Sequence, residues 1–365
     1  MKIERNSQES KALDLMRFPL AILIVLLHTG ADCGPDDFTY YIAKYVNAPI
    51  VKLAVPTFFF ISGYLFFIGK EQFTVAVYKE TLTKKIRGLL VPYIIWNYIA
   101  LMLSYACNFL KTGSIGDVMP WEVITILWGN GEGVMGRSLF GYEYPVIVSP
   151  VAGVLWFMRD LMIMMVCSVF MYKIIYWIKK WFFLIVLVMN LFGLGIPFTG
   201  FSLSAITFFY SGAYFSIHQI NVFTWLDKHR IFWLLLWPCS VVLQMLLVTF
   251  SVEISNRLSV LVLSSGVAFI FELAYICANK RNKIYGIVSN LGETSFFIYT
   301  FGNTLILWLI NKDIGYMLYA IPHYGVFLCY EFLFITKIVE CVFVYYFLKR
   351  CAPKVLSIIT GGRLK

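Results

Sequence analysis

The sequence predicts an all-α, polytopic integral membrane protein with about ten transmembrane helices and both termini in the cytoplasm. Composition is the first reason, because 60% of the 365 residues are hydrophobic and only 14% are charged, whereas soluble domains carry about 25% charged residues. The mean hydropathy is +0.77. The other two reasons are long apolar windows that recur along the chain and an uneven distribution of lysine and arginine between successive loops.

The apolar windows are long enough to cross a hydrocarbon core of about 30 Å. Together they predict one membrane domain over 1–365, with a cytoplasmic N-terminus at 1–12, a long outward loop at 110–150 and a cytoplasmic tail at 349–365. No secretory signal peptide is expected, so the first window stays in the mature chain. The windows are 13–31, 50–69, 89–109, 154–177, 181–198, 203–218, 231–250, 258–278, 294–311 and 326–348.

The fifth and sixth windows differ from the others because glycine and proline interrupt them. Gly193, Gly195, Pro197 and Gly200 favour a broken or re-entrant pair of helices there.

The outward loop contains the stretch PWEVITILW, which predicts a short amphipathic helix along the membrane interface. Trp121 and Trp128 would then anchor the interface, with a platform that stacks on sugars as the alternative.

Basic residues predict the orientation. They gather before the first window, in alternate loops and after the last window, so those parts are expected in the cytoplasm. The net charge of +10 therefore indicates contact with anionic membrane lipids, not with nucleic acid. The eight cysteines form no CxxC pair, so neither a metal site nor a disulfide framework is predicted.

Charged residues within the windows are costly in lipid, which makes each of them a functional candidate. Lys337 and Glu340 are three residues apart, and a structural ion pair is the favoured interpretation. For Arg159 and Asp160 a structural ion pair is one interpretation; because neighbours on a helix point to different faces, the alternative is that each needs its own partner. The remaining candidates are Arg17, His28, Glu272 and Glu331.

Arg17 and His28 share one stripe of the first predicted helix. Eleven residues at about 100° each bring them to within about 20° of the same face, about 16 Å apart along the axis. An imidazole exchanges a proton near neutral pH, although His28 can also simply bridge helices by hydrogen bonds. Asp32 would orient the imidazole if the helix continues through Gly30, and is otherwise an exposed loop residue.

Several motifs resemble the acyltransferase-3 family of membrane-bound O-acyltransferases. RFPLAILIVLLH has the Arg-x10-His spacing of that family's first helix, and VPTFFFISGYLFF is similar to its second. KKIRGLLVPYIIW resembles the basic inner loop that enters helix three, with Lys84 standing at the first arginine of Arg-x-x-Arg. LWFMRDL is similar to the family's Trp-Phe segment. LGETSFFIYTFGN resembles a segment with a second histidine, where this chain has Gly302 and Asn303.

The resemblance implies a multi-pass enzyme of the inner (cytoplasmic) membrane. The family moves an acyl group, commonly acetyl, from cytoplasmic acyl-CoA to a hydroxyl of a sugar or other acceptor. The expected acceptor is a cell-surface glycan or its lipid-linked precursor, and no metal is expected. The chain ends soon after the last window, so no additional periplasmic catalytic domain is expected.

The same resemblance suggests the site residues. His28 would act as the general base, and Arg17 would contact the donor or stabilise charge on the thioester. Cofactor-binding candidates are Lys84, Lys85, Arg87 and Arg159, with Tyr299 as a further cavity residue; the lysines and Arg87 can equally meet lipid headgroups.

Direct transfer in a ternary complex is the expected mechanism, with an acyl-histidine as the alternative. A transporter or flippase is the competing class, and a receptor or scaffold is a third. The sequence favours no oligomeric state. The Ser62-Gly63-Tyr64 triplet is expected to serve close helix packing.

Overall fold

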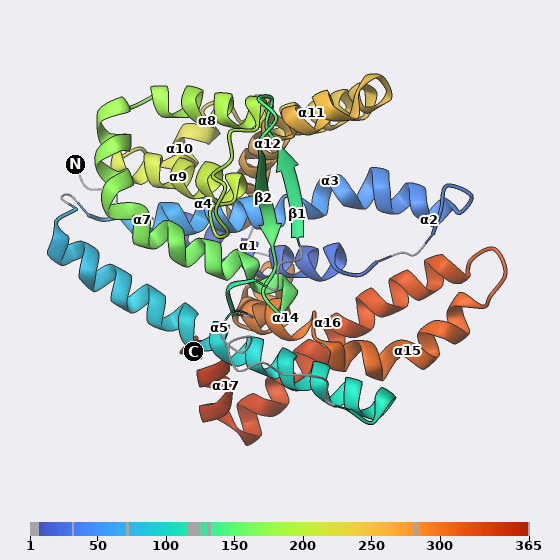
Figure 1. Ribbon diagram of the computed structural model, residues 1–365. Helices are drawn as coiled ribbons and strands as arrows, with labels where there is room; N and C mark the ends of the chain where they lie inside the picture. The colour runs from blue at the N-terminus through green and yellow to red at the C-terminus, as the bar shows by residue number, and fades with distance from the viewer. Residues whose placement is uncertain are drawn as a thin grey trace.

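The computed structural model describes residues 7–30, 33–70, 73–114, 125, 127–129, 133–279 and 283–363. The described chain is almost entirely helical (Figure 1), as predicted. Its helices are α1 (Ser7–Leu27), α2 (Phe38–Tyr41), η1 (Ile42–Asn47), α3 (Ala48–Val51), α4 (Ala54–Phe67), α5 (Val75–Thr112), η2 (Gly153–Leu155), α7 (Trp156–Ile178), α8 (Trp181–Phe192), α9 (Leu203–Ile217), α10 (Val222–Asp227), α11 (Arg230–Phe250), α12 (Val252–Asn279), α13 (Lys283–Leu291), η3 (Gly292–Thr294), α14 (Ser295–Phe301), α15 (Leu305–Tyr319), α16 (Gly325–Cys351) and α17 (Pro353–Ile359).

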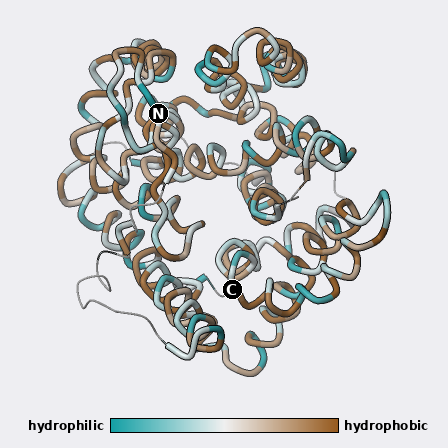
Figure 2. Tube along the Cα trace, turned by 45° about the vertical axis from the view of Figure 1, so that its right-hand side comes forward, coloured by the Kyte–Doolittle hydropathy of each residue, from teal (hydrophilic) through white to brown (hydrophobic). Residues whose placement is uncertain are grey.

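Apolar residues surround most helices and are not confined to one face (Figure 2), as expected where hydrocarbon replaces water outside the protein. Among the described residues, five helical segments are long and apolar enough to cross a membrane. The number of ten spans and the orientation of the termini stay predictions. The five segments are Phe38–Phe67, Val75–Thr112, Gly153–Ile178, Arg230–Phe250 and Val252–Asn279.

The helix breaks between α8 and α9, as the glycines and proline predict. Gly193 caps α8 in the left-handed region with φ +64°, a conformation that glycine adopts because it has no Cβ. The 12 residues of α8 and 15 of α9 give lengths of about 18 and 22 Å. Both are shorter than a hydrocarbon core of about 30 Å, so neither helix crosses it alone.

Two glycines let α4 and α9 pack backbone against backbone. A Cβ at Gly63 would lie 1.8 Å from the carbonyl oxygen of Phe209, and a Cβ at Gly212 would lie 2.0 Å from that of Phe60. No larger residue fits at either position without separating the helices. The packing role predicted for Gly63 is confirmed.

α1 lies inside the helical assembly. Its buried face packs into the main apolar core, and it contacts α12, α14 and α4. This packing fixes the position of α1, and with it Arg17, relative to the neighbouring helices. The buried residues of α1 in the main core are Ala12, Leu13, Met16, Leu20 and Ile24.

The ninth predicted window is not one helix. α14 ends at Phe301, and residues 302–304 separate it from α15. Gly302 sits in a tight place, because a Cβ there would lie 3.0 Å from Val25 Cγ2 and 3.4 Å from Cys341 Sγ. The break therefore puts the end of α14 beside the end of α1.

Part of the long loop predicted at 110–150 forms a β-hairpin, which the sequence analysis did not predict. β1 (Gly133–Arg137) pairs antiparallel with β2 (Glu143–Val148). Trp121 and most of the PWEVITILW stretch lie outside the described residues, although Trp128 is helical.

The predicted C-terminal tail packs on α5. α17 lies beside α5 (Figure 1), and Trp96 Nε1 donates a hydrogen bond to the Ile359 carbonyl oxygen at 3.0 Å. Gly361 has φ +68°, and a Cβ there would lie 2.1 Å from the Gly88 carbonyl oxygen. Both the left-handed backbone and the close approach to Gly88 require glycine at this position.

Candidate active site

Arg17 lies on the exposed side of α1. Its Nη1 is 3.1 Å from Asp14 Oδ1, one turn earlier, and 47% of the Arg17 side chain is exposed. An exposed pair of this kind contributes little stability. The guanidinium thus remains open to a stronger anionic partner.

His28 directly follows α1. Its backbone N–H donates to the carbonyl oxygens of Ile24 and Val25, both at 3.2 Å, and the residue is exposed. α1 ends at Leu27, and Thr29 Oγ1 donates back to the Val25 carbonyl oxygen, so the helix does not continue through Gly30 as an orienting role of Asp32 would require. Asp32 lies outside the described residues.

Lys337 of α16 approaches His28 from a different part of the chain. Lys337 is only 8% exposed, and it is close enough for its charge to act on the imidazole. Burying a lysine costs free energy, because its charge loses contact with water. A buried lysine close to His28 is therefore a functional candidate.

The ion pair predicted between Lys337 and Glu340 is wrong. Glu340 instead accepts two contacts from Asn311 Nδ2, at 3.1 Å from Oε1 and 2.8 Å from Oε2. The reason is the packing of α15 against α16, which supplies an amide donor to Glu340 while Lys337 points toward α1.

The segment where the family has a second histidine also lies near this end of α1. Gly302 packs against Val25, one turn before His28. Asn303 Nδ2 donates to the Tyr299 carbonyl oxygen at 3.1 Å, while its buried Oδ1 has no hydrogen-bond partner among the described residues. Asn303 therefore offers a polar acceptor at the level of His28.

Arg363 forms a cationic group with Arg17, at the middle of α1. The Arg363 Cζ lies 4.1 Å from the Phe296 ring centroid, and its Nη1 donates to the Gly88 carbonyl oxygen at 3.1 Å. Desolvation by the surrounding protein, and second the charge of Arg17, lower the pKa of Arg363 to about 10. Since the residue also keeps exposed surface, its guanidinium occupies a recess that water reaches. Two guanidiniums that repel each other favour an anion between them.

The three basic residues of the predicted inner loop lie on α5 instead. The helix already begins at Val75, because Thr74 Oγ1 caps it by accepting from the Val77 N–H at 3.4 Å. Lys84, Lys85 and Arg87 are all exposed, and Lys84 Nζ is 2.6 Å from Glu80 Oε1.

Arg87 lies next to the docking point of the C-terminal segment. It precedes Gly88, whose carbonyl oxygen binds Arg363. Arg87 and Arg363 therefore lie at the same turn of α5.

Arg159 is engaged by protein groups. Its Nε and Nη2 lie 3.1 and 2.9 Å from Asp160 Oδ1, and Nη1 donates to the Trp128 carbonyl oxygen. Of the two interpretations of Arg159 and Asp160, the structure shows the ion pair; both side chains are buried, where an unpaired charge is costly. Arg159 joins α7 to the outward segment, and its role in cofactor binding stays a prediction.

Tyr299 and Glu272 are also buried by neighbouring residues. The Tyr299 hydroxyl donates to the Val154 carbonyl oxygen at 2.6 Å. Glu272 is buried, with Arg230 Nε 3.5 Å from its Oε2. The Tyr299 hydrogen bond links two segments, whereas Glu272 has an ion pair with Arg230 but no hydrogen-bond partner for either buried oxygen among the described residues.

The arrangement gives α1 a cationic group at its middle, where Arg363 approaches Arg17, and a histidine directly after its last residue. Sequence reasoning did not single out Lys337 for this site, because its spacing pointed to Glu340. It placed Arg363 only among the basic residues of the tail. No local pattern distinguishes either residue, and only the packing of α16 and α17 brings them to α1.

Comparison with known proteins gives a family but no individual relative. A family model described as "Acyltransferase domain", the acyltransferase-3 model, matches residues 10–338. No curated protein and no solved structure gives a significant match. The matched range includes Arg17, His28, the basic residues of α5 and Lys337, and leaves Arg363 outside. Because the match covers most of the chain, the protein belongs to the acyltransferase-3 family of membrane acyltransferases, as its motifs indicate.

Proposed function

We propose that this protein moves an acetyl or another short acyl group from cytoplasmic acyl-CoA to a hydroxyl group in the inner membrane. The proposed acceptor is a cell-surface glycan or its lipid-linked precursor. The observation that carries the proposal is α1, with a guanidinium at its middle, an imidazole directly after its last residue, and a second cation close to each.

The Arg17–Arg363 group is suited to binding the donor, because CoA carries anionic phosphates. Arg17 and Arg363 would bind phosphate oxygens of CoA through charge-assisted hydrogen bonds, for which the planar guanidinium is well shaped. Lys84, Lys85 and Arg87 on α5 add positive charge to the approach. From there, an extended pantetheine arm would follow α1 and α14 toward His28.

The histidine end suits the chemistry. His28 would accept the proton of the acceptor hydroxyl while that oxygen attacks the thioester carbon. A carbon–oxygen bond forms, the carbon–sulfur bond breaks, and the imidazolium returns its proton to the CoA sulfur. The Lys337 ammonium would stabilise negative charge on the thioester oxygen in the transition state.

Direct transfer is favoured over an acyl-enzyme. The hydroxyl adjacent to His28 belongs to Thr29, which is buried and donates to the Val25 carbonyl oxygen at 2.8 Å. That hydroxyl is thus oriented toward the backbone and not toward a substrate.

The test is mass analysis of the host's surface glycans. Four strains are compared: wild type, gene deletion, and the deletion complemented at matched protein level with either H28A or H229A. His229 is an exposed histidine outside α1 and serves as the matched control.

We expect one acyl increment to be absent in the deletion and H28A strains and present in the other two. Normal acylation with H28A would contradict the assignment of the base. Loss of the whole glycan in the deletion strain would instead indicate transport.

A further inference from the structure

A second site lies on the other side of the helical assembly. A cavity of about 770 Å³ separates the α11–α12 pair from α8, α9 and α10. This volume falls within the range of about 300–1,000 Å³ that is typical of ligand sites. His28, Arg17 and Arg363 do not line this cavity, so the cavity is distinct from the candidate active site.

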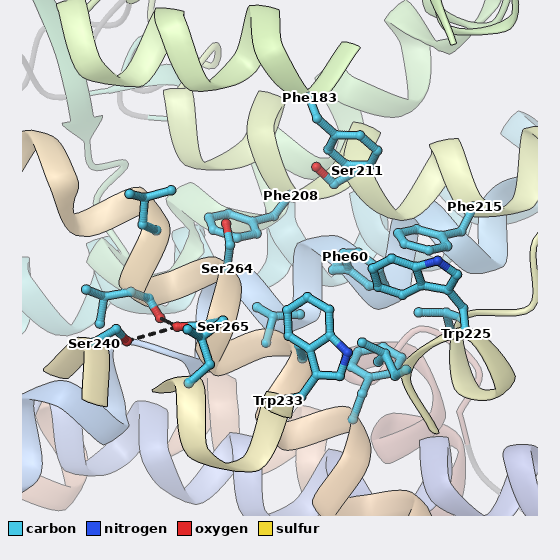
Figure 3. Close-up of a pocket in the computed structure, with 18 of the residues that line it drawn as sticks. Phe60, Phe183, Phe208, Ser211, Phe215, Trp225, Trp233, Ser240, Ser264 and Ser265 are labelled. Atoms are coloured by element: carbon cyan, nitrogen blue, oxygen red, sulfur yellow. Dashed lines mark hydrogen bonds between the residues drawn. The ribbon is translucent and has the colours of Figure 1, made fainter. Parts of the chain in front are cut away.

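The cavity is long and apolar. Figure 3 shows Phe183, Phe208 and Phe215 above it and Trp233 below it. Both Trp233 and Leu247 of α11 line it, and 14 residues of helix correspond to about 21 Å. One leaflet of hydrocarbon is about 15 Å deep, half of a core of about 30 Å. The cavity therefore accommodates a chain of leaflet length.

The cavity is open on the side of α11. Two of its lining residues, Leu243 and Leu261, are 57% and 48% exposed. No residue of α11 is buried, although this helix is among the segments apolar enough to cross a membrane. In a bilayer, the opening would face hydrocarbon, and lipid chains would reach it directly.

One end of the cavity carries polar groups. Lys180, the residue before α8, lines the cavity and also a neighbouring hollow formed with Trp177, Lys179 and Trp181. At the start of α11, the Trp233 Nε1–H is buried and has no hydrogen-bond acceptor among the described residues. A buried donor without an acceptor costs free energy, so an oxygen atom of a ligand would satisfy it.

We propose that this cavity binds one glycerophospholipid with an anionic headgroup. An acyl chain lies along α11, the headgroup and phosphate meet Lys180 and Lys179, and Trp233 Nε1 donates to an ester or phosphate oxygen. Positive charge at one end of a chain-length apolar cavity is the complement of such a lipid. The lipid fills the space between α11–α12 and α8–α9 and joins the two helix groups.

The experiment measures thermal unfolding of the full chain in detergent, after lipid removal, with added phosphatidylglycerol or phosphatidylcholine. In S264F, a phenylalanine fills the cavity from an exposed position of α12, and K180Q removes the charge. The controls are V242F, at an exposed residue of α11 outside the lining, and K173Q, at an exposed lysine of α7.

We expect phosphatidylglycerol to raise the unfolding temperature of the wild type and both controls more than phosphatidylcholine does. K180Q should need a roughly fivefold higher phosphatidylglycerol concentration for half of the effect, and S264F should lose the effect. Equal stabilisation of all variants, or equal effects of the two lipids on the wild type, would overturn the proposal. Mass analysis of the lipid that co-purifies with the wild type gives a second readout, and a lipid-linked saccharide found there would also overturn it.

Discussion

Replacing Arg363 by glutamine separates donor binding from folding. The Arg363 guanidinium is repelled by Arg17 and has lost part of its water, so its removal relieves a cost in the empty protein. The hydrogen bond from Trp96 to Ile359 still holds α17 on α5. Because the change also removes the contacts of Arg363 with the Gly88 carbonyl oxygen and the Phe296 ring, we expect R363Q to unfold close to the wild-type temperature.

The same change should weaken binding of the donor. A hydrogen bond to a charged group contributes about 1.5–3 kcal/mol, and a guanidinium that water reaches belongs at the low end of that range. Since about 1.4 kcal/mol corresponds to a tenfold change in affinity, the Kd of acetyl-CoA should rise about tenfold. KM should rise in parallel with little change in kcat, because Arg363 approaches α1 near Arg17 and not near His28.

Calorimetric titration of acetyl-CoA into the purified protein measures this effect. R350Q is the matched control, since Arg350 is an exposed arginine at the end of α16. Binding by R363Q within about twofold of wild type, with R17Q clearly weakened, would show that Arg363 is outside the donor site and refute this reasoning.

Three further predictions concern other parts of the molecule. K337M should lower kcat about 10²-fold or more with little change in the Kd of the donor, as expected for a group that stabilises transition-state charge; single-turnover acyl transfer measures this. G63V should destabilise the protein by at least about 1–3 kcal/mol through overpacking, whereas G286V, at a helical glycine with open space around it, should not; detergent melting curves compare the two. Burial, and second the charge of Lys85, lower the pKa of Lys70 from 10.5 to about 8. Between these two pH values the unfolded chain binds more protons than the folded protein, so the free energy of unfolding rises with pH in this range. K70M should lose this rise, and equal pH dependence of the two proteins would contradict it.

The sequence by itself determined the features that depend on local periodicity and composition. The helical membrane character follows from apolar windows, whereas the shared stripe of Arg17 and His28 stays a prediction, because α1 ends at Leu27, before His28. The break near Gly193 and the packing role of Gly63 also follow from what glycine permits. These properties are carried by neighbouring residues, so no knowledge of distant contacts is needed.

Only the tertiary structure decided which charges meet. Lys337 faces His28 because α16 packs beside α1, and Arg363 reaches Arg17 because α17 folds back onto α5. Arg159 pairs with its own neighbour, contrary to the simple helical-face rule, because burial makes an unpaired charge costly. Contacts of this kind join segments far apart in the chain, and their energies depend on how the helices pack around them.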